Sequence, residues 1–217
     1  MTPATRTLVL ASASPARART LTCAGVRFET VVSQVDEGEV TRRAEAVAGA
    51  ALDPVDLALL LARAKAEDVA YRSELPDHAL VLGCDSVLDV DGQVHGKPAG
   101  PEQAVARLAG LSGRSAVLHT GHWLIDADHP TGRAAGAVGS ATVHFADLDP
   151  DEIAAYVATG EPLQVAGAFT VDGLGGAFVR GVEGDHHTVV GVSLPLLRTM
   201  IRSFGLSWPQ LWVNRCR

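Results

Sequence analysis

Apolar and polar stretches alternate along the chain in a pattern that predicts strands and helices by turns. Residues 7–10 are predicted as a strand. A helix is expected next, because Ser14 suits its N-cap, Pro15 its first position and Gly25 its C-terminal end. Further helices are expected over residues 53–71, 100–111, 149–160 and 194–204, further strands over 28–32, 116–125 and 141–145, and a surface loop over 132–139. With no linker apparent, the pattern favours one mixed α/β domain over residues 1–217.

Residues 80–98, LVLGCDSVLDVDGQVHGKP, are the stretch around which the candidate chemistry gathers. An apolar run breaks at Asp85, which predicts a carboxylate at the end of a buried strand. In α/β proteins, functional residues commonly lie at strand ends. Asp91 and Gly92 suit a two-residue hairpin turn, because both positions of that turn need positive φ. The returning chain would bring Lys97 into the neighbourhood of Asp85.

Composition indicates a soluble globular protein with a sizeable core: the chain has 217 residues, of which 47% are hydrophobic and 20% charged. The sequence has no apolar run of membrane-spanning length, and its first residues lack a secretory signal, so a cytoplasmic protein is expected. Its three cysteines, Cys23, Cys84 and Cys216, are widely spaced, which argues against a disulfide framework or a zinc knuckle.

The charge balance narrows the choice of partner. A net charge of −7 argues against a nucleic-acid polymer, which would require a basic face, but it does not exclude a nucleotide. Of the 18 basic residues, 16 are Arg, and Lys65 and Lys97 are the two exceptions. Lysine is a compact point charge that suits a phosphate, so both are candidate phosphate ligands, with surface placement as the alternative.

Two loops could bind a charged ligand. Ser12, Ser14 and Arg17 surround the predicted start of the first helix, where backbone N–H groups favour an anion; an ordinary capped helix with a surface arginine is the alternative. Asp36 and Glu37 lie in an acidic loop, which could hold a divalent metal or be merely solvated.

A glycine-rich segment, residues 160–191, suggests either tight turns or backbone lying close to a nucleotide. It contains Asp172 at a predicted turn and Asp185 before two histidines, and turns alone could account for both acids. His119 and His122, three apart on a predicted strand, point to opposite faces and are interpreted as structural.

Four fragments in order resemble the Maf family of nucleoside triphosphate pyrophosphatases. They are LVLASASPARARTL, SQVDE, CDSVLDVDGQVHGKP and GEPLQVAGAFTVDGLGGAFVRGVEGD. The resemblance implies a two-lobed α/β fold, a mixed twisted sheet flanked by helices around a central cleft, related to inosine triphosphatases. It also implies hydrolysis between the α and β phosphates to the monophosphate and diphosphate, with the help of Mg²⁺ or Mn²⁺.

Carried over by motif, the resemblance assigns roles to individual residues. Asp85 matches the general base, and Glu37 an acidic position of the active site, so these two are the expected metal ligands. The expected phosphate contacts are Ser12, Arg17, Lys65 and Lys97.

The positions that select the base depart from the known subgroups of the family. Members acting on dTTP and UTP have Arg, Thr and Gln there, and members acting on a methylated GTP have another set. This chain has Ala16, Ser86 and Asp172, which match neither pattern. We therefore expect a broader specificity that includes modified nucleotides, with the house-cleaning role and the link to cell division arrest that the family suggests.

Two other functions remain open at this stage. LDVDG resembles the nucleophile motif of haloacid dehalogenase-type phosphatases, with Asp89 as nucleophile, and such an enzyme would release orthophosphate from monoesters. A non-catalytic nucleotide-binding regulator is the third reading. A homodimer is suggested by the family, with the tail that contains Trp208 and Trp212 as a candidate contact.

Overall fold

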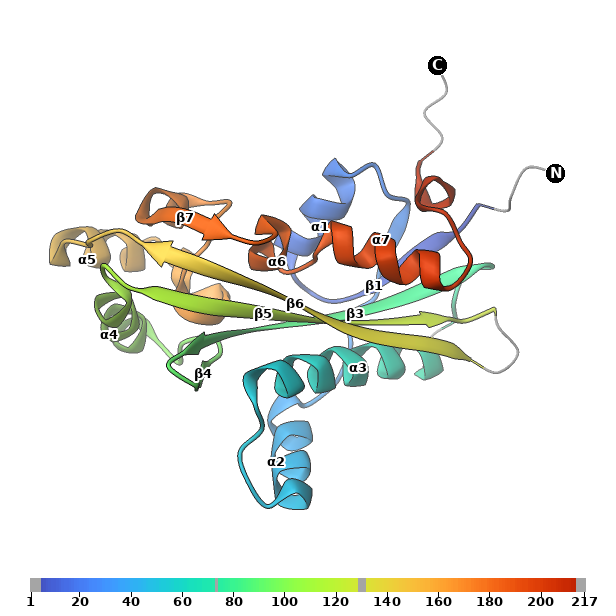
Figure 1. Ribbon diagram of the computed structural model, residues 1–217, viewed down its shortest axis with the longest axis horizontal. Coiled ribbons are helices and arrows are strands. Elements are labelled where there is room, and N and C mark those ends of the chain that lie inside the picture. Colours follow the sequence, from blue (N-terminus) through green and yellow to red (C-terminus); the bar gives the residue numbers. More distant parts are fainter. Residues whose placement is uncertain (1–4, 73, 129–131, 214–217) are drawn as a thin grey trace.

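The computed structural model describes residues 5–72, 74–128 and 132–213, which form a mixed sheet flanked by helices (Figure 1). The sheet has seven strands in the order β2-β1-β3-β5-β6-β7, and β4 pairs with β3 beside this path. The strands are β1 (Thr7–Ala11), β2 (Phe28–Thr30), β3 (Ala79–Val90), β4 (Gln93–His95), β5 (Ser115–Asp126), β6 (Arg133–Phe145) and β7 (Val179–Glu183). β1 runs parallel to β2 and β3, and the other pairs are antiparallel.

Helices cover both faces of this sheet. In Figure 1, α3 lies along one face with α2 outside it, while α1, α6 and α7 lie on the other side. The α-helices are α1 (Pro15–Cys23), α2 (Glu37–Ala48), α3 (Pro54–Arg72), α4 (Pro101–Leu111), α5 (Pro150–Ala158), α6 (His186–Val190) and α7 (Leu194–Ser203). Short 3₁₀ turns are η1 (Glu161–Gln164), η2 (Ala166–Ala168), η3 (Leu174–Phe178) and η4 (Trp208–Leu211). This arrangement confirms the predicted mixed α/β fold.

Two glycines bring α3 unusually close to the sheet. A Cβ atom on Gly83 would lie 2.0 Å from the carbonyl oxygen of Ala62, and one on Gly121 would lie 2.2 Å from that of Ala58. Side chains are therefore excluded at both strand positions, and the backbone of α3 rests directly on β3 and β5. Side chains on the sheet-facing side of α3 can therefore contact residues of β3 directly.

The predicted hairpin is confirmed. β3 and β4 pair from Leu88 to Val90, and Asp91 and Gly92 form the turn with φ of 54° and 81°. The carboxylate of Asp89 also accepts the backbone N–H of Gly92 at 2.7 Å. Both turn residues adopt the left-handed conformation that a two-residue turn of this kind requires.

Three local predictions are wrong. β3 does not end at Asp85 but continues to Val90, because β5 pairs with it along this whole stretch. Glu37 is not in a loop: Asp36 caps α2, and Glu37 is its first residue. Residues 132–139 are not a surface loop, since β6 begins at Arg133. Within this strand Gly136 leaves room for the ring of Trp123, because a Cβ atom at this position would lie 2.5 Å from it.

The C-terminal segment packs on the body of the protein. Trp212 forms an isolated antiparallel bridge with Val26, and Trp208 packs against the core cluster that includes Leu21 of α1 and Leu197 of α7. Trp212 itself remains about half exposed. Among the described helices, none is long and apolar enough to cross a membrane.

Candidate functional site

The candidate site forms where β3 lacks a strand partner on one of its edges. One edge pairs with β5 from Leu80 to Asp89. The other edge pairs with β1 as far as Gly83 and with β4 from Leu88 onward. Residues 84–87 are thus without a strand neighbour on that side, and we call them the unpaired edge of β3. Neighbouring residues of this edge point to opposite faces of the sheet, so ligand groups can come from both faces.

Asp85 points to the α3 face of the sheet and meets two charged side chains. Lys65 Nζ lies 2.5 Å from Asp85 Oδ1 and 2.7 Å from Glu37 Oε1. The side chains of Lys65 and Asp85 are 11% and 10% exposed, whereas Glu37, at the start of α2, is 56% exposed. The structure therefore brings three predicted site residues together, from α2, α3 and β3, around one ammonium group.

Burial sets the proton affinity of Asp85. Desolvation raises the pKa of its carboxyl above the ordinary value, although the charges of Lys65 and Arg17 and the hydrogen bond from Lys65 partly oppose this shift, and nearby Glu37 adds to it. A buried carboxylate with a raised pKa is a stronger base than an exposed one. Asp85 is thus suited to accept a proton from a bound molecule.

Arg17 lies on the other face, buried and without a carboxylate partner among the described residues. Its Nε donates to the carbonyl oxygen of Gly191 at 2.8 Å, and its Nη1 to that of Cys84 at 2.8 Å. Nη1 also donates to Ser12 Oγ and Nη2 to Ser86 Oγ, both at 3.0 Å. A buried guanidinium whose acceptors among the described residues are all neutral lacks a counter-ion, which makes an anion its natural ligand.

The remaining predicted residues near α1 are also accounted for. Ser12 is buried, and its Oγ accepts the N–H of Ser14 at 3.2 Å. Ser14 caps α1 by accepting the N–H of Arg17, so its hydroxyl serves the helix in this structure. Ala16 is half-buried in the first turn, where its methyl group leaves more room than a longer side chain would.

Ser86 belongs to a hydrogen-bond chain that the sequence did not reveal. Its Oγ lies 2.8 Å from Thr120 Oγ1, and Thr120 donates to the carbonyl oxygen of Thr188 at 2.8 Å. Because Thr120 must give its proton to Thr188, Ser86 donates to Thr120 and accepts from Arg17. Thr120, fully buried on β5, thereby fixes the orientation of a predicted base-selecting hydroxyl.

Lys97 lies beyond the end of β4. The β3–β4 ladder ends at the pair Leu88 and His95, and Lys97 follows two residues later in a bend. Its side chain is exposed, and within the described ranges it forms no ion pair. Within the described residues Lys97 and Asp85 form no hydrogen bond or ion pair, so the expected proximity of these two side chains stays a prediction.

Asp172 lies in the glycine-rich segment and pairs with Arg19 of α1, with Asp172 Oδ2 2.9 Å from Arg19 Nη2. This loop is held from behind by Glu161. The carboxylate of Glu161 accepts the Thr170 hydroxyl at 2.6 Å and the backbone N–H groups of Leu174 and Gly175 at 3.1 Å each. Sequence reasoning did not single out Glu161 or Arg19, since neither belongs to a recognisable local pattern.

The residues around Lys65 also suit a hard divalent cation. Glu37 and Asp85 supply two carboxylates that converge on one point, and Mg²⁺ commonly binds through one or two carboxylates together with substrate phosphates. The donor set therefore fits the metal that the family resemblance implies.

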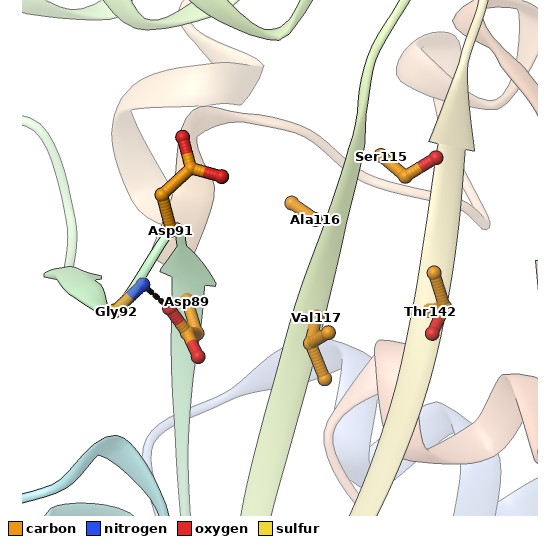
Figure 2. Close-up of a pocket in the computed structure, with 7 residues that line it drawn as sticks. All are labelled: Asp89, Asp91, Gly92, Ser115, Ala116, Val117 and Thr142. Atoms are coloured by element: carbon orange, nitrogen blue, oxygen red, sulfur yellow. Dashed lines mark hydrogen bonds between the residues drawn. The ribbon is translucent and has the colours of Figure 1, made fainter.

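Asp89 does not fit the position of a phosphatase nucleophile. It lies within β3, and its carboxylate binds the N–H of Gly92 in the hairpin turn. Figure 2 shows it at a shallow hollow of about 280 Å³ formed by the hairpin and by β5 and β6. None of the predicted site residues lines this hollow.

The fold and the charges along the unpaired edge define an α/β protein with a site suited to an anionic ligand. The family model for Maf-like proteins matches residues 7–204, so the chain belongs to the Maf family. The chain is 53% identical over 208 residues to a nucleoside triphosphate pyrophosphatase of Salinispora tropica, covering 94% of this chain and 87% of that protein. It is 50% identical over 213 residues to a protein of the same name from Streptomyces coelicolor, covering 98% of each.

Proposed function

We propose that this chain hydrolyses nucleoside triphosphates between the α and β phosphates, giving the nucleoside monophosphate and diphosphate. The names of its relatives support the activity. The observation that carries the proposal is the pairing of Lys65 with Asp85 beside a buried Arg17 that has no carboxylate partner within the described residues. Such a site combines a base with cations for a polyphosphate.

In this proposal Asp85 is the general base. It takes a proton from a water molecule, whose oxygen attacks the α phosphorus. The bond from that phosphorus to the bridging oxygen breaks, and diphosphate leaves. Lys65 stays against Asp85 and orients its carboxylate, while its charge stabilises the phosphoryl oxygens in the transition state.

Cations from both sides of the unpaired edge bind the triphosphate. Arg17 is held by carbonyl and hydroxyl oxygens, which leaves one Nη2–H group to donate to a phosphate oxygen. Ser12 can donate its hydroxyl to the same group, and Lys97 can fold onto the phosphates because its side chain is exposed. Preorganised donors of this kind account for a large share of catalysis in phosphoryl transfer.

Glu37 and Asp85 would hold Mg²⁺ or Mn²⁺. When bound, the ion would supply positive charge that neutralises the phosphates. Glu37 is the better placed to change partner, since its side chain is more than half exposed and Lys65 retains Asp85.

Ala16, Ser86 and Asp172 are the proposed base-selecting residues. Asp172 can accept from an exocyclic amine or ring N–H, and the small Ala16 leaves space, so we propose a broad range of bases that includes modified nucleotides. A role in clearing such nucleotides or in cell division arrest, a homodimer and a cytoplasmic location stay predictions.

A nucleotide panel with identification of every product tests the proposal. Standard and modified triphosphates are incubated with the chain and Mg²⁺ or Mn²⁺, and the products are separated by chromatography. Monophosphate and diphosphate in equal amounts are expected. Orthophosphate released from monoesters would instead indicate a phosphatase, and triphosphate binding without hydrolysis would indicate a regulator. Turnover of dTTP alone would contradict the broad specificity.

A further inference from the structure

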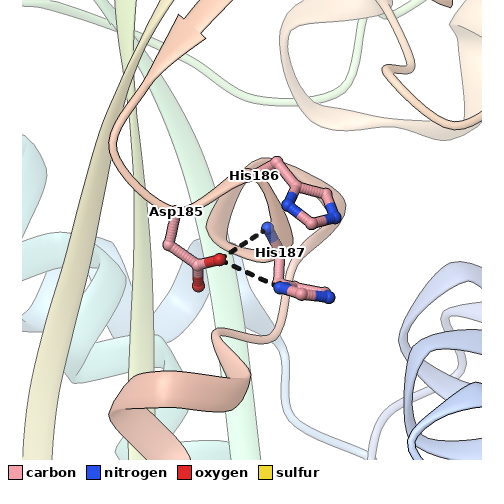
Figure 3. Close-up of side chains that lie close together, drawn as sticks. All are labelled: Asp185, His186 and His187. Carbon is pink, nitrogen blue, oxygen red and sulfur yellow. Dashed lines mark hydrogen bonds and ion pairs between the residues drawn. The ribbon is translucent and has the colours of Figure 1, made fainter.

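A second group of potential metal ligands lies at the start of α6, apart from the residues around Lys65. Asp185, His186 and His187 each offer a ligand atom, and these atoms all lie within 4.8 Å of one another (Figure 3). Two imidazoles beside a carboxylate differ in chemistry from Glu37 and Asp85, which offer oxygen alone.

Hydrogen bonds fix the orientation of Asp185 and the tautomer of His187. Asp185 Oδ1 accepts the backbone N–H of His187 at 3.1 Å and its ring Nδ1–H at 2.9 Å, while Oδ2 accepts the Ser193 hydroxyl at 2.6 Å. Both carboxylate oxygens of Asp185 therefore already accept hydrogen bonds, and Asp185 holds the ring of His187 in one orientation. With its proton on Nδ1, His187 keeps a lone pair on Nε2.

His186 has its ring nitrogens available. Its ring lies against that of His187, tilted by 37° with the centroids 3.9 Å apart, and His186 is exposed. Within the described part of the chain, no hydrogen bond or ion pair occupies its ring nitrogens. A histidine that donates its Nδ1–H to a carboxylate beside a second, unengaged histidine is a common arrangement around protein-bound metals.

We propose that His186 and His187 form a second metal site, in which Asp185 orients His187, and which binds a divalent transition metal that imidazole favours, such as Zn²⁺, Ni²⁺ or Co²⁺. Mg²⁺ is expected to bind poorly to these imidazoles, because it prefers oxygen ligands. The site therefore differs in metal preference from the carboxylates around Lys65.

The position of α6 suggests what the metal would stabilise. The carbonyl oxygen of His187 accepts hydrogen bonds from the N–H groups of Gly191 and Val192. The carbonyl oxygen of Gly191 in turn accepts a hydrogen bond from Nε of Arg17 at 2.8 Å. A helix of five residues has little stability of its own. Metal bound at its start would hold in place the segment that anchors Arg17.

Calorimetric titration of the chain without a histidine tag tests this site. Ni²⁺ is titrated in the presence of excess Mg²⁺, and melting is followed with and without Ni²⁺. One equivalent of Ni²⁺ is expected to bind and to raise Tm. His186→Ala should weaken binding by about 10-fold or more and abolish the rise in Tm. The fold should be kept, because the His186 side chain makes no hydrogen bond or ion pair with any other described residue.

Two control variants make the result specific. His78→Ala removes another histidine that pairs with an aspartate, Asp128, and should leave Ni²⁺ binding unchanged. Glu37→Gln alters the carboxylates around Lys65 and should also leave it unchanged, so this site can stand or fall separately from the proposed hydrolysis. Absence of saturable binding, binding unchanged in His186→Ala, or loss of binding in Glu37→Gln would overturn the proposal.

Discussion

Lys65 Nζ lies 2.5 Å from Asp85 Oδ1, although Lys65 belongs to α3 and Asp85 to the middle of β3. This contact requires the close approach of helix and sheet that Gly83 and Gly121 permit. It places a cation beside a buried carboxylate at the one stretch of β3 that has no strand partner on its second edge. The catalytic proposal depends on this pair.

Asp85→Asn is expected to lower kcat by about 10²–10⁴-fold, because an amide cannot accept the proton of the attacking water. Lys65 keeps Glu37 as a partner, so the fold should survive, and circular dichroism would confirm it. Asp89→Asn is the matched control, since Asp89 is four residues further on the same face of β3. Full activity in Asp85→Asn, or loss of activity in Asp89→Asn alone, would contradict the assignment of the base.

Arg17→Met is expected to raise KM about 10- to 100-fold, since a charge-assisted hydrogen bond to phosphate contributes roughly 1.5–3 kcal/mol. Thermal stability should also fall, because the change leaves the buried carbonyl oxygens of Gly191 and Cys84 without their donor. Arg19→Met, on the same helix but 62% exposed, provides the comparison for steady-state kinetics and melting. Equal KM values in the two variants would count against Arg17 as a phosphate ligand.

Asp172→Asn is expected to change the order of kcat/KM among bases, because an amide both donates and accepts hydrogen bonds where the carboxylate accepts alone. The ion pair of Asp172 with Arg19 is partly exposed and contributes little stability, so Tm should be nearly unchanged. Competition between pairs of nucleotides in one reaction measures the order directly. A change by the same factor for every base would show that Asp172 does not select among them.

His122 is expected to make the fold sensitive to acid. Burial lowers its pKa to about 4, and its Nε2 must stay unprotonated to accept the N–H of Ser193 at 2.8 Å. A histidine with a lowered pKa contributes its stability above the unfolded pKa of 6.5, and this stability is lost as the pH falls toward 4. The loss should reach roughly 3 kcal/mol.

Urea unfolding across this range of pH measures that loss. His122→Gln should remove most of the pH dependence, because glutamine can donate to the carbonyl oxygen of Thr120 and accept from Ser193 without titrating. The same slope with pH in both proteins would contradict this role for His122.

Local sequence signals predicted those parts of the structure that depend on local geometry. Asp91 and Gly92 form the predicted turn because few residue pairs tolerate two positive φ values. The helix expected over residues 149–160 likewise forms as α5, which Asp149 and Glu152 start with a capping box. Such elements are decided within a few residues, so a single sequence is enough to find them.

Features decided by distant parts of the chain could not be predicted in this way. β3 extends beyond Asp85 because β5, more than twenty residues later, supplies its partners. Thr120 and Glu161 act through hydrogen bonds to segments far from their own, and the unpaired edge exists because β1 and β4 stop short of each other. The resemblance to a family identified the candidate site residues, but it did not reveal that Asp85 and Ser86 serve opposite faces of the sheet.

Hydrolysis in water enriched in heavy oxygen tests the central claim most directly. The chain is incubated with a triphosphate, Mg²⁺ and labelled water, and both products are analysed by mass spectrometry. Attack on the α phosphorus predicts one labelled oxygen in the nucleoside monophosphate and an unlabelled diphosphate. Label in the diphosphate, or release of labelled orthophosphate, would contradict the account.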